Sequence, residues 1–130
     1  EVLKGERCGK MSADYNFWKY KQDVVHEDEK VYASLCDGEQ LEDLQSLPIE
    51  KIRERIRAVF SGWDWLDQDN CEKEGFGSFT LYTTPQLVRF DCYGMSEQNL
   101  NLFIDVMTEE FGIPVYDPQI STRFDAWTDV

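Results

Sequence analysis

Residues 78–112 constrain the fold of this chain more than any other stretch, because the period of their apolar side chains changes from two residues to that of a helix. Apolar and polar residues alternate over residues 79–82 and again over residues 88–93, with the Thr84-Pro85 turn between them. Alternation places successive side chains on opposite faces of a strand. These residues therefore predict an antiparallel hairpin with one apolar face and one polar, aromatic face.

A helix is predicted directly after this hairpin. Ser96 provides a hydroxyl group at the N-cap position, and Leu100, Phe103 and Met107 follow at spacings of three and four residues. This spacing gathers the apolar side chains on one side of a helix. Gly112 stands at the end, where a left-handed residue commonly terminates a helix.

A second amphipathic helix is predicted between Ser46 and Gly62. The Ser46 hydroxyl is expected to cap it, and Pro48 suits the first turn because a residue there needs no amide hydrogen. Gly62 is expected to end it. Its apolar stripe consists of Ile49, Ile52, Ile56, Val59 and Phe60.

The N-terminal third predicts a second hairpin. Aromatic alternation over residues 15–20 and the apolar run at residues 31–35 are each typical of a short strand. The charged residues 26–29 lie between them. We therefore expect a hairpin over residues 16–35 with an acidic tip.

The segments around the second half of the chain complete the expected architecture. Residues 63–74 are dense in acid and tryptophan and predict a loop. Residues 113–116 predict a closing edge strand. The tail, which contains Ile120, Phe124 and Trp127, is expected to fold back over the core.

The predicted fold class is α+β, with an antiparallel sheet and two helices packed on one face. The element order contains a ferredoxin-like β-α-β-β-α-β kernel preceded by an extra N-terminal strand. Residues 15–130 are expected to form a single domain, and residues 1–14 a flexible arm. Met11 is a candidate natural start within that arm.

The charge of the chain limits its partners. Twenty-six acidic residues against 13 basic ones give a formal net charge of -13. Nucleic acids and anionic membrane surfaces would be repelled by this field. No apolar run is long enough to span a membrane. The composition therefore favours a basic protein partner over nucleic acid or membrane.

The spacing of the cysteines predicts no metal site, although their even number permits two disulfides. No C-x-x-C pair of the kind that binds zinc or carries redox chemistry occurs, and no segment resembles a secretion signal. Reduced thiols in a cytoplasmic protein are the expectation. The cysteines are Cys8, Cys36, Cys71 and Cys92.

Nothing in the sequence identifies a catalytic residue, a cofactor site or a metal site, so a non-enzymatic role is favoured. His26 is the sole histidine and falls in a charged tip, which leaves no base to activate a serine or cysteine nucleophile. A calcium loop starting at Asp67 fails, because Cys71 falls at the fifth position and Glu72 at the glycine position.

The acid-rich segments are the leading candidates for a partner-binding surface. Aromatic anchors supply much of the affinity of protein interfaces, while complementary charge speeds encounter. The leading hypothesis is a small acidic binding protein, of the inhibitor or immunity type, that engages a basic nuclease or another nucleic-acid-binding protein. Ordinary solubility charge would explain the same acids. The candidate contacts are Trp63, Asp64, Trp65, Asp67, Asp69, Glu72, Glu39, Glu42 and Asp43.

The polar, aromatic face of the first hairpin supports an alternative hypothesis. Tyr82, Arg89, Asp91 and Tyr93 lie on that face and could line a pocket for a small ligand or a substrate, beside the C-terminal tail. Tyrosines on a sheet can also stack RNA bases, but the net charge opposes that function. A homo-oligomer that pairs these sheet faces is a further alternative.

Overall fold

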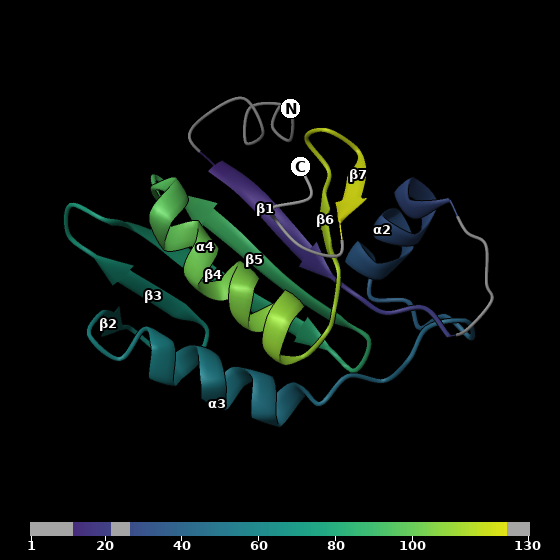
Figure 1. Cartoon of the computed structure of the whole chain (residues 1–130), viewed down its shortest axis with the longest axis horizontal. Helices are drawn as coiled ribbons and strands as arrows, with labels where there is room; N and C mark the ends of the chain where they lie inside the picture. Colours follow the sequence, from purple (N-terminus) through teal and green to yellow (C-terminus); the bar gives the residue numbers. More distant parts are fainter. Residues whose placement is uncertain (1–11, 22–26, 125–130) are drawn as a thin grey trace.

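The computed structural model describes residues 12–21 and 27–124 and places them in the α+β class, as the sequence predicts. Within these residues, seven strands form one antiparallel sheet in the order β2-β3-β4-β5-β1-β6-β7 (Figure 1). The elements are β1 (Ser12–Phe17), α2 (Asp28–Cys36), α3 (Ile49–Val59), β2 (Asp64–Trp65), β3 (Asn70–Lys73), β4 (Gly77–Thr84), β5 (Leu87–Tyr93), α4 (Glu97–Asp105), the π-helical turn η1 (Val106–Glu110), β6 (Val115–Asp117) and β7 (Thr122–Phe124).

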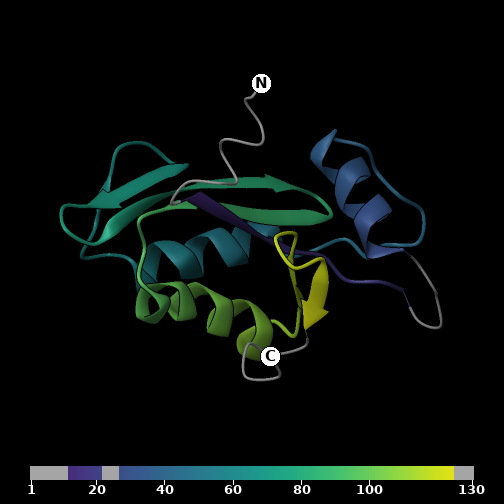
Figure 2. The same ribbon diagram turned by 90° about the horizontal axis from the view of Figure 1, so that it is seen from above.

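The β4–β5 hairpin, α3 and α4 share the main hydrophobic core. Phe79 and Phe90 are buried on the same face of the hairpin, and the Phe90 ring stacks on Phe103 of α4 with ring centroids 4.0 Å apart. Ile52 and Ile56 of α3 are fully buried in the same core. Figure 2 shows α3 and α4 below the sheet in that view. We call this side of the sheet the inner face, and the other side the outer face.

The C-terminal helix begins and ends as predicted. The Ser96 hydroxyl accepts a hydrogen bond from the Asn99 amide at 3.2 Å, and Gly112 has a φ of 65°. Between these ends α4 widens into η1, where the Thr108 hydroxyl donates to the Ile104 carbonyl at 2.9 Å. The sequence gives no signal for this π turn, because its buried residues fit the apolar stripe of an ordinary helix.

The ends of α3 differ from the prediction. Pro48 is the N-cap, and no side chain caps the helix, because the Ser46 hydroxyl lies two residues too early. The helix ends at Val59 with Phe60 as C-cap, before Gly62 is reached. The Phe60 ring at this C-cap is buried in the main core.

Residues 31–35 belong to α2, so the predicted hairpin over residues 16–35 and the extra N-terminal strand of the predicted fold are both wrong. Val31 and Leu35 are buried four residues apart, a spacing that fits a helix as well as alternation fits a strand. Asp28 and Glu29 in the first turn favour a helix, because carboxylates interact well with its positive end.

Residues 63–74 are also not a loop, because β2 and β3 extend the sheet beyond β4. Trp65 and Cys71 lie opposite each other and pack toward the core. Asp64 and Glu72, also opposite each other, are exposed on the outer face. The sequence does not reveal these strands, because they contain only two and four residues and several of the residues around them are acidic.

The end of the chain extends the sheet. Since β6 pairs with both β1 and β7, the predicted closing edge strand is an interior strand, and β7 is the edge. Over its described part the tail forms β7 alongside β6, and Phe124 packs against the main core as predicted. Ile120 in the connecting turn is exposed.

The N-terminal boundary also moves. Because β1 starts at Ser12, residues 12–14 lie in the sheet and not in the predicted arm. The predictions that concern Cys8, His26 and Trp127 fall outside the described residues.

We expect Gly77→Ala to destabilise the fold much more than Gly75→Ala. Both glycines have positive φ angles, of 107° and 84°, which cost an L-residue about 1–2 kcal/mol. A Cβ at Gly77 would lie 2.7 Å from the Tyr93 carbonyl oxygen, whereas a Cβ at Gly75 meets nothing within 4 Å. In chemical denaturation, the free energy of unfolding should therefore fall by about 1 kcal/mol for Gly75→Ala and by at least about 2 kcal/mol for Gly77→Ala. Equal losses would contradict this account.

Candidate functional site

The outer face of the sheet divides into a half covered by α2 and a half over which none of the described helices lies. Val31 and Leu35 of α2 pack with Trp18, Leu87 and Tyr116 in a second hydrophobic cluster at the α2 end of the molecule. At the other end, β2, β3 and the adjoining ends of β4 and β5 carry side chains that none of the described helices covers. We call these residues the open face. They are Asp64, Leu66, Asp67, Asn70, Glu72, Ser78, Thr80 and Tyr93.

The strand register aligns the open face into rows. Asp64 lies opposite Glu72, Glu72 opposite Ser78, and Ser78 opposite Tyr93, so these four side chains form one row across four strands. Asn70 and Thr80 start the next row. The sheet thus unites on one surface residues that the sequence separates by almost thirty positions.

The open face combines exposed apolar groups with acids. Leu66 is 62% exposed and Tyr93 45% exposed, and both are among the most exposed large apolar side chains of the described residues. They line a groove of about 240 Å³ together with Asp67, Glu72 and the polar side chains between them. An apolar patch beside acids is typical of an interaction surface.

Asp64 and Glu72 form a pair of like charges on this surface. They lie directly opposite in adjacent strands, both are exposed, and neither forms an ion pair with any of the described residues. Like charges in directly opposed positions destabilise a sheet. The pair therefore leaves two adjacent carboxylates exposed on the open face.

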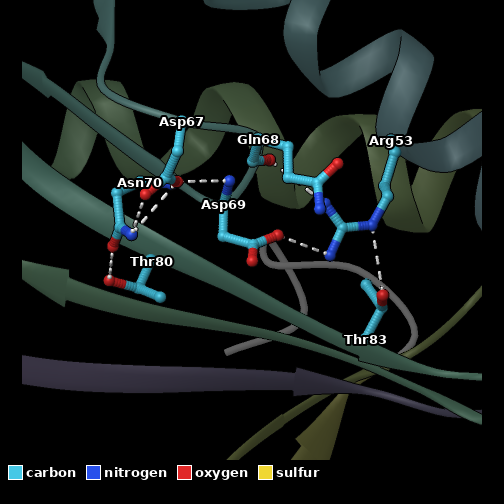
Figure 3. A network of polar contacts seen from close by, with 7 residues as sticks. All are labelled: Arg53, Asp67, Gln68, Asp69, Asn70, Thr80 and Thr83. Atoms are coloured by element: carbon cyan, nitrogen blue, oxygen red, sulfur yellow. Dashed lines mark hydrogen bonds and ion pairs between the residues drawn. The ribbon is translucent and has the colours of Figure 1, made fainter.

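Asp67 holds the turn between β2 and β3 (Figure 3). Its Oδ1 accepts from the backbone amides of Asp69 and Asn70 at 2.8 and 2.7 Å, and the Asn70 side-chain amide donates to both of its oxygens at 3.1 Å. These donors, the Asn70 side chain first, lower the pKa of the Asp67 carboxyl. The Thr80 hydroxyl extends the network by donating to Asn70 Oδ1 at 2.6 Å.

Arg53 of α3 fixes the same turn from the other side (Figure 3). Its guanidinium contacts the Asp69 carboxylate at 2.9 Å, the Gln68 carbonyl at 3.2 Å and the Thr83 hydroxyl at 3.1 Å. Asp69, a predicted partner contact, is thus engaged within the chain. Arg53 therefore joins α3 to the β2–β3 turn through Gln68 and Asp69 and to β4 through Thr83.

Trp63 and Trp65 are mainly part of the scaffold. Trp63 lies edge-on to Phe60, with centroids 5.0 Å apart, and Trp65 donates from Nε1 to the Phe60 carbonyl at 3.1 Å. The Arg57 guanidinium covers the Trp65 ring at 4.4 Å. Both tryptophans are half-buried against the main core, so only part of each ring reaches solvent.

The remaining predicted partner contacts lie elsewhere. Glu39, Glu42 and Asp43 fall in the connection between α2 and α3, at the α2 end of the molecule, while β2 and β3 lie at the opposite end in both views (Figures 1 and 2). The two sets of predicted contacts therefore lie at opposite ends of the molecule.

Three of the four residues of the predicted ligand face lie under or beside α2. Arg89 lies over the Tyr82 ring at 4.6 Å, contacts the Asp91 carboxylate at 3.2 Å, and donates to Cys36 Sγ at 3.4 Å. The element that lies over this half is α2, whereas the sequence left open whether the face is covered and suggested a pocket beside the C-terminal tail. Tyr93 is set apart from them on the open face.

A second contact holds α2 on the sheet. The Tyr32 hydroxyl donates to the buried Asp14 carboxylate at 2.8 Å, and the buried Asn16 side chain donates to the same oxygen at 3.0 Å. Burial, followed by the nearby Asp14 charge, raises the pKa of Tyr32. Tyr32 therefore remains a hydrogen-bond donor throughout the neutral range.

Sequence reasoning missed several residues of the open face. Ser78 and Thr80 occupy the outward positions of β4 and could have been found from the alternation that predicts the strand. Leu66 and Asn70 carry no such signal, because they flank a turn inside a segment expected to be a loop.

Among the described residues, no group of three or more histidine, cysteine or acidic side chains is arranged to hold a metal ion. None of the described helices combines the length and apolar character that crossing a membrane requires. No protein-family model and no curated protein matches this chain.

We expect Arg53→Met to lower the free energy of unfolding by about 1 kcal/mol, since it removes one partly exposed ion pair and two further hydrogen bonds. Leu81 reports on the same attachment, because its amide donates to the Asp69 carbonyl at 2.8 Å. Hydrogen exchange at Leu81 should accelerate. Lys51→Met, at an exposed position of the same helix, is the matched control and should change neither quantity.

Asp67→Asn should destabilise the chain at about pH 6 but not at about pH 2. The folded-state pKa of Asp67 lies below its ordinary value of 3.8, so its contribution is present above that value and is lost as the pH falls through the folded pKa. Thermal unfolding of both proteins across this range tests the expectation. Asp64→Asn, on the same hairpin, controls for loss of one negative charge; an identical pH profile for the two variants would refute the assignment.

Proposed function

We propose that this chain is a small acidic, non-enzymatic binding protein that engages a basic protein partner through the open face. The observation that carries the proposal is the exposed pair Leu66 and Tyr93 beside the carboxylates of Asp64 and Glu72. Aromatic side chains are common energetic centres of interfaces, and complementary charge around them raises the rate of encounter.

The fold supports this use of the outer face. We infer that β1, α3, β4, β5, α4 and β6 form a ferredoxin-like kernel, since β4, β5, β1 and β6 are neighbours in that order and are connected through α3 and α4. The β2–β3 hairpin is then an addition that widens the sheet, and α2 is an addition that covers one half of the outer face. Both additions frame the open face.

The charge of the whole chain indicates what kind of partner is expected. A net charge of -13 attracts proteins with strongly basic surfaces, of which nucleases and other nucleic-acid-binding proteins are the main class. Occupation of such a surface would inhibit the partner, which is the action of an inhibitor or immunity-type protein. The free thiols of Cys36, Cys71 and Cys92 are compatible with the reducing cytoplasm as the place of this encounter.

A small-ligand or enzymatic role of the outer face is the second candidate. The groove beside Tyr93 offers the hydroxyls of Ser78 and Thr80, which favours a polar ligand. Its volume of about 240 Å³ is less than the roughly 300 Å³ at which ligand pockets usually begin. Self-association through the open face is a further alternative, and light scattering would detect it.

Cross-linking from Tyr93 tests the proposal directly. A photo-reactive phenylalanine analogue at Tyr93 should trap a basic protein in cells of the source organism. The same analogue at Leu102, an exposed apolar residue of α4, is the matched control and should not trap it. Trapping of the same proteins from both positions would contradict a specific surface.

Affinity measurements with the purified partner complete the test. The double variant Asp64→Lys, Glu72→Lys should weaken binding by at least about tenfold and reduce its salt dependence. Glu39→Lys combined with Glu42→Lys applies the same charge change at the opposite end of the molecule, and its effect should be several-fold smaller. Equal effects would mean that net charge alone drives binding, and the proposal would fail.

A further inference from the structure

The covered half of the outer face contains an arginine held by its own neighbours. The Arg89 guanidinium lies 4.6 Å from the centre of the Tyr82 ring and 3.2 Å from the Asp91 carboxylate. Stacking on an aromatic ring and pairing with a carboxylate are the two interactions for which a planar guanidinium is best suited. This half of the sheet thus shows how the surface accommodates an arginine.

Arginine on an aromatic ring recurs in this chain. The Arg57 guanidinium lies 4.4 Å from the Trp65 ring centre, and the Arg123 guanidinium lies 4.6 Å from that of Tyr20. Tyr93, by contrast, has no lysine or arginine over its ring among the described residues, although it is 45% exposed.

The groove on the open face offers the same kinds of groups as the site of Arg89. Tyr93 provides the ring, and Glu72 and Asp67 provide carboxylates, all on the wall of one groove. Hydrogen bonds from Asn70 and from two backbone amides fix the position of the Asp67 carboxylate in advance. Leu66 adds an apolar wall suited to the methylene groups of a long side chain.

The size of the groove is right for one long side chain. Its volume of about 240 Å³ leaves room for one long side chain but is too small for a helix or strand of a partner. Lysine could also place its ammonium over a ring, as Lys73 does over Phe76 at 5.0 Å, but a compact ammonium group neither stacks flat on the ring nor forms two parallel bonds with a carboxylate. The chemistry therefore selects arginine.

We infer that this groove is a pocket for one arginine side chain of the basic partner, with its guanidinium on the Tyr93 ring and between the Glu72 and Asp67 carboxylates. The inference rests on the proposed function and specifies the residue by which the partner is recognised. Such an arginine, at the centre of the open face, would be a main energetic contact of the complex.

Titration of the full chain with blocked tripeptides tests the pocket without the partner. The probes are acetyl-Gly-Arg-Gly-amide and its lysine and citrulline counterparts, followed by amide chemical shifts. The arginine peptide should shift the amides of Asn70, Glu72, Ser78 and Tyr93 and bind at least about threefold more tightly than the lysine peptide. The neutral citrulline peptide should bind at least about tenfold more weakly.

Matched variants identify the groups involved. Glu72→Gln should weaken binding of the arginine peptide about fivefold. Glu74 is an exposed acid that does not line this groove, so Glu74→Gln should leave the affinity for the peptide unchanged. Tyr93→Leu should abolish the preference for arginine over lysine, and Tyr93→Phe should retain it.

Equal binding of the arginine and lysine peptides, shifts centred outside the groove, or equal effects of Glu72→Gln and Glu74→Gln would each overturn the arginine assignment. If one of these occurs while Tyr93 still cross-links to a basic protein whose binding depends on Asp64 and Glu72, the proposed function survives alone. If the peptide binds as expected but no basic partner is trapped, the pocket survives and the proposed function fails.

Discussion

The stacked pair of Phe90 and Phe103 is the contact on which the arrangement of the sheet depends. It attaches a central strand to α4, and the neighbouring ring of Phe79 extends the contact to Phe60 at the end of α3. These rings occupy one side of β4 and β5. Because side chains alternate along a strand, the residues between the rings lie on the other side of the sheet. The outer face is thus a direct consequence of how the core is filled.

The sequence predicts the elements around this core well and the additions to it poorly. The β4–β5 hairpin, the Ser96 cap and the Gly112 end follow from short-range rules and are confirmed. The predictions failed for α2 and β2–β3, where an apolar run is short or interrupted by acids and tertiary contacts decide the outcome. Val31 and Leu35 fit either period until Leu44, Leu87 and Tyr116 are placed beside them.

The candidate site shows a similar division. Asp64, Glu72 and Tyr93 were singled out from composition and alternation, but their assembly into one row requires the pairing of β2 with β3, β3 with β4 and β4 with β5. Asp69 looked equivalent to Asp64 in the sequence, yet Arg53 engages it within the chain. Charge alone therefore does not separate acids that support the fold from acids that remain available to a partner.

Among the described residues, the two edge strands of the sheet are short, with two residues in β2 and three in β7. An exposed edge is a template for pairing with another chain, and brevity is one of the means by which proteins prevent it. In β2 one of the two residues is also an acid, which would repel the same strand of a second molecule. The chain can consequently present a broad, partly apolar sheet surface at high concentration with little tendency to grow into extended sheets.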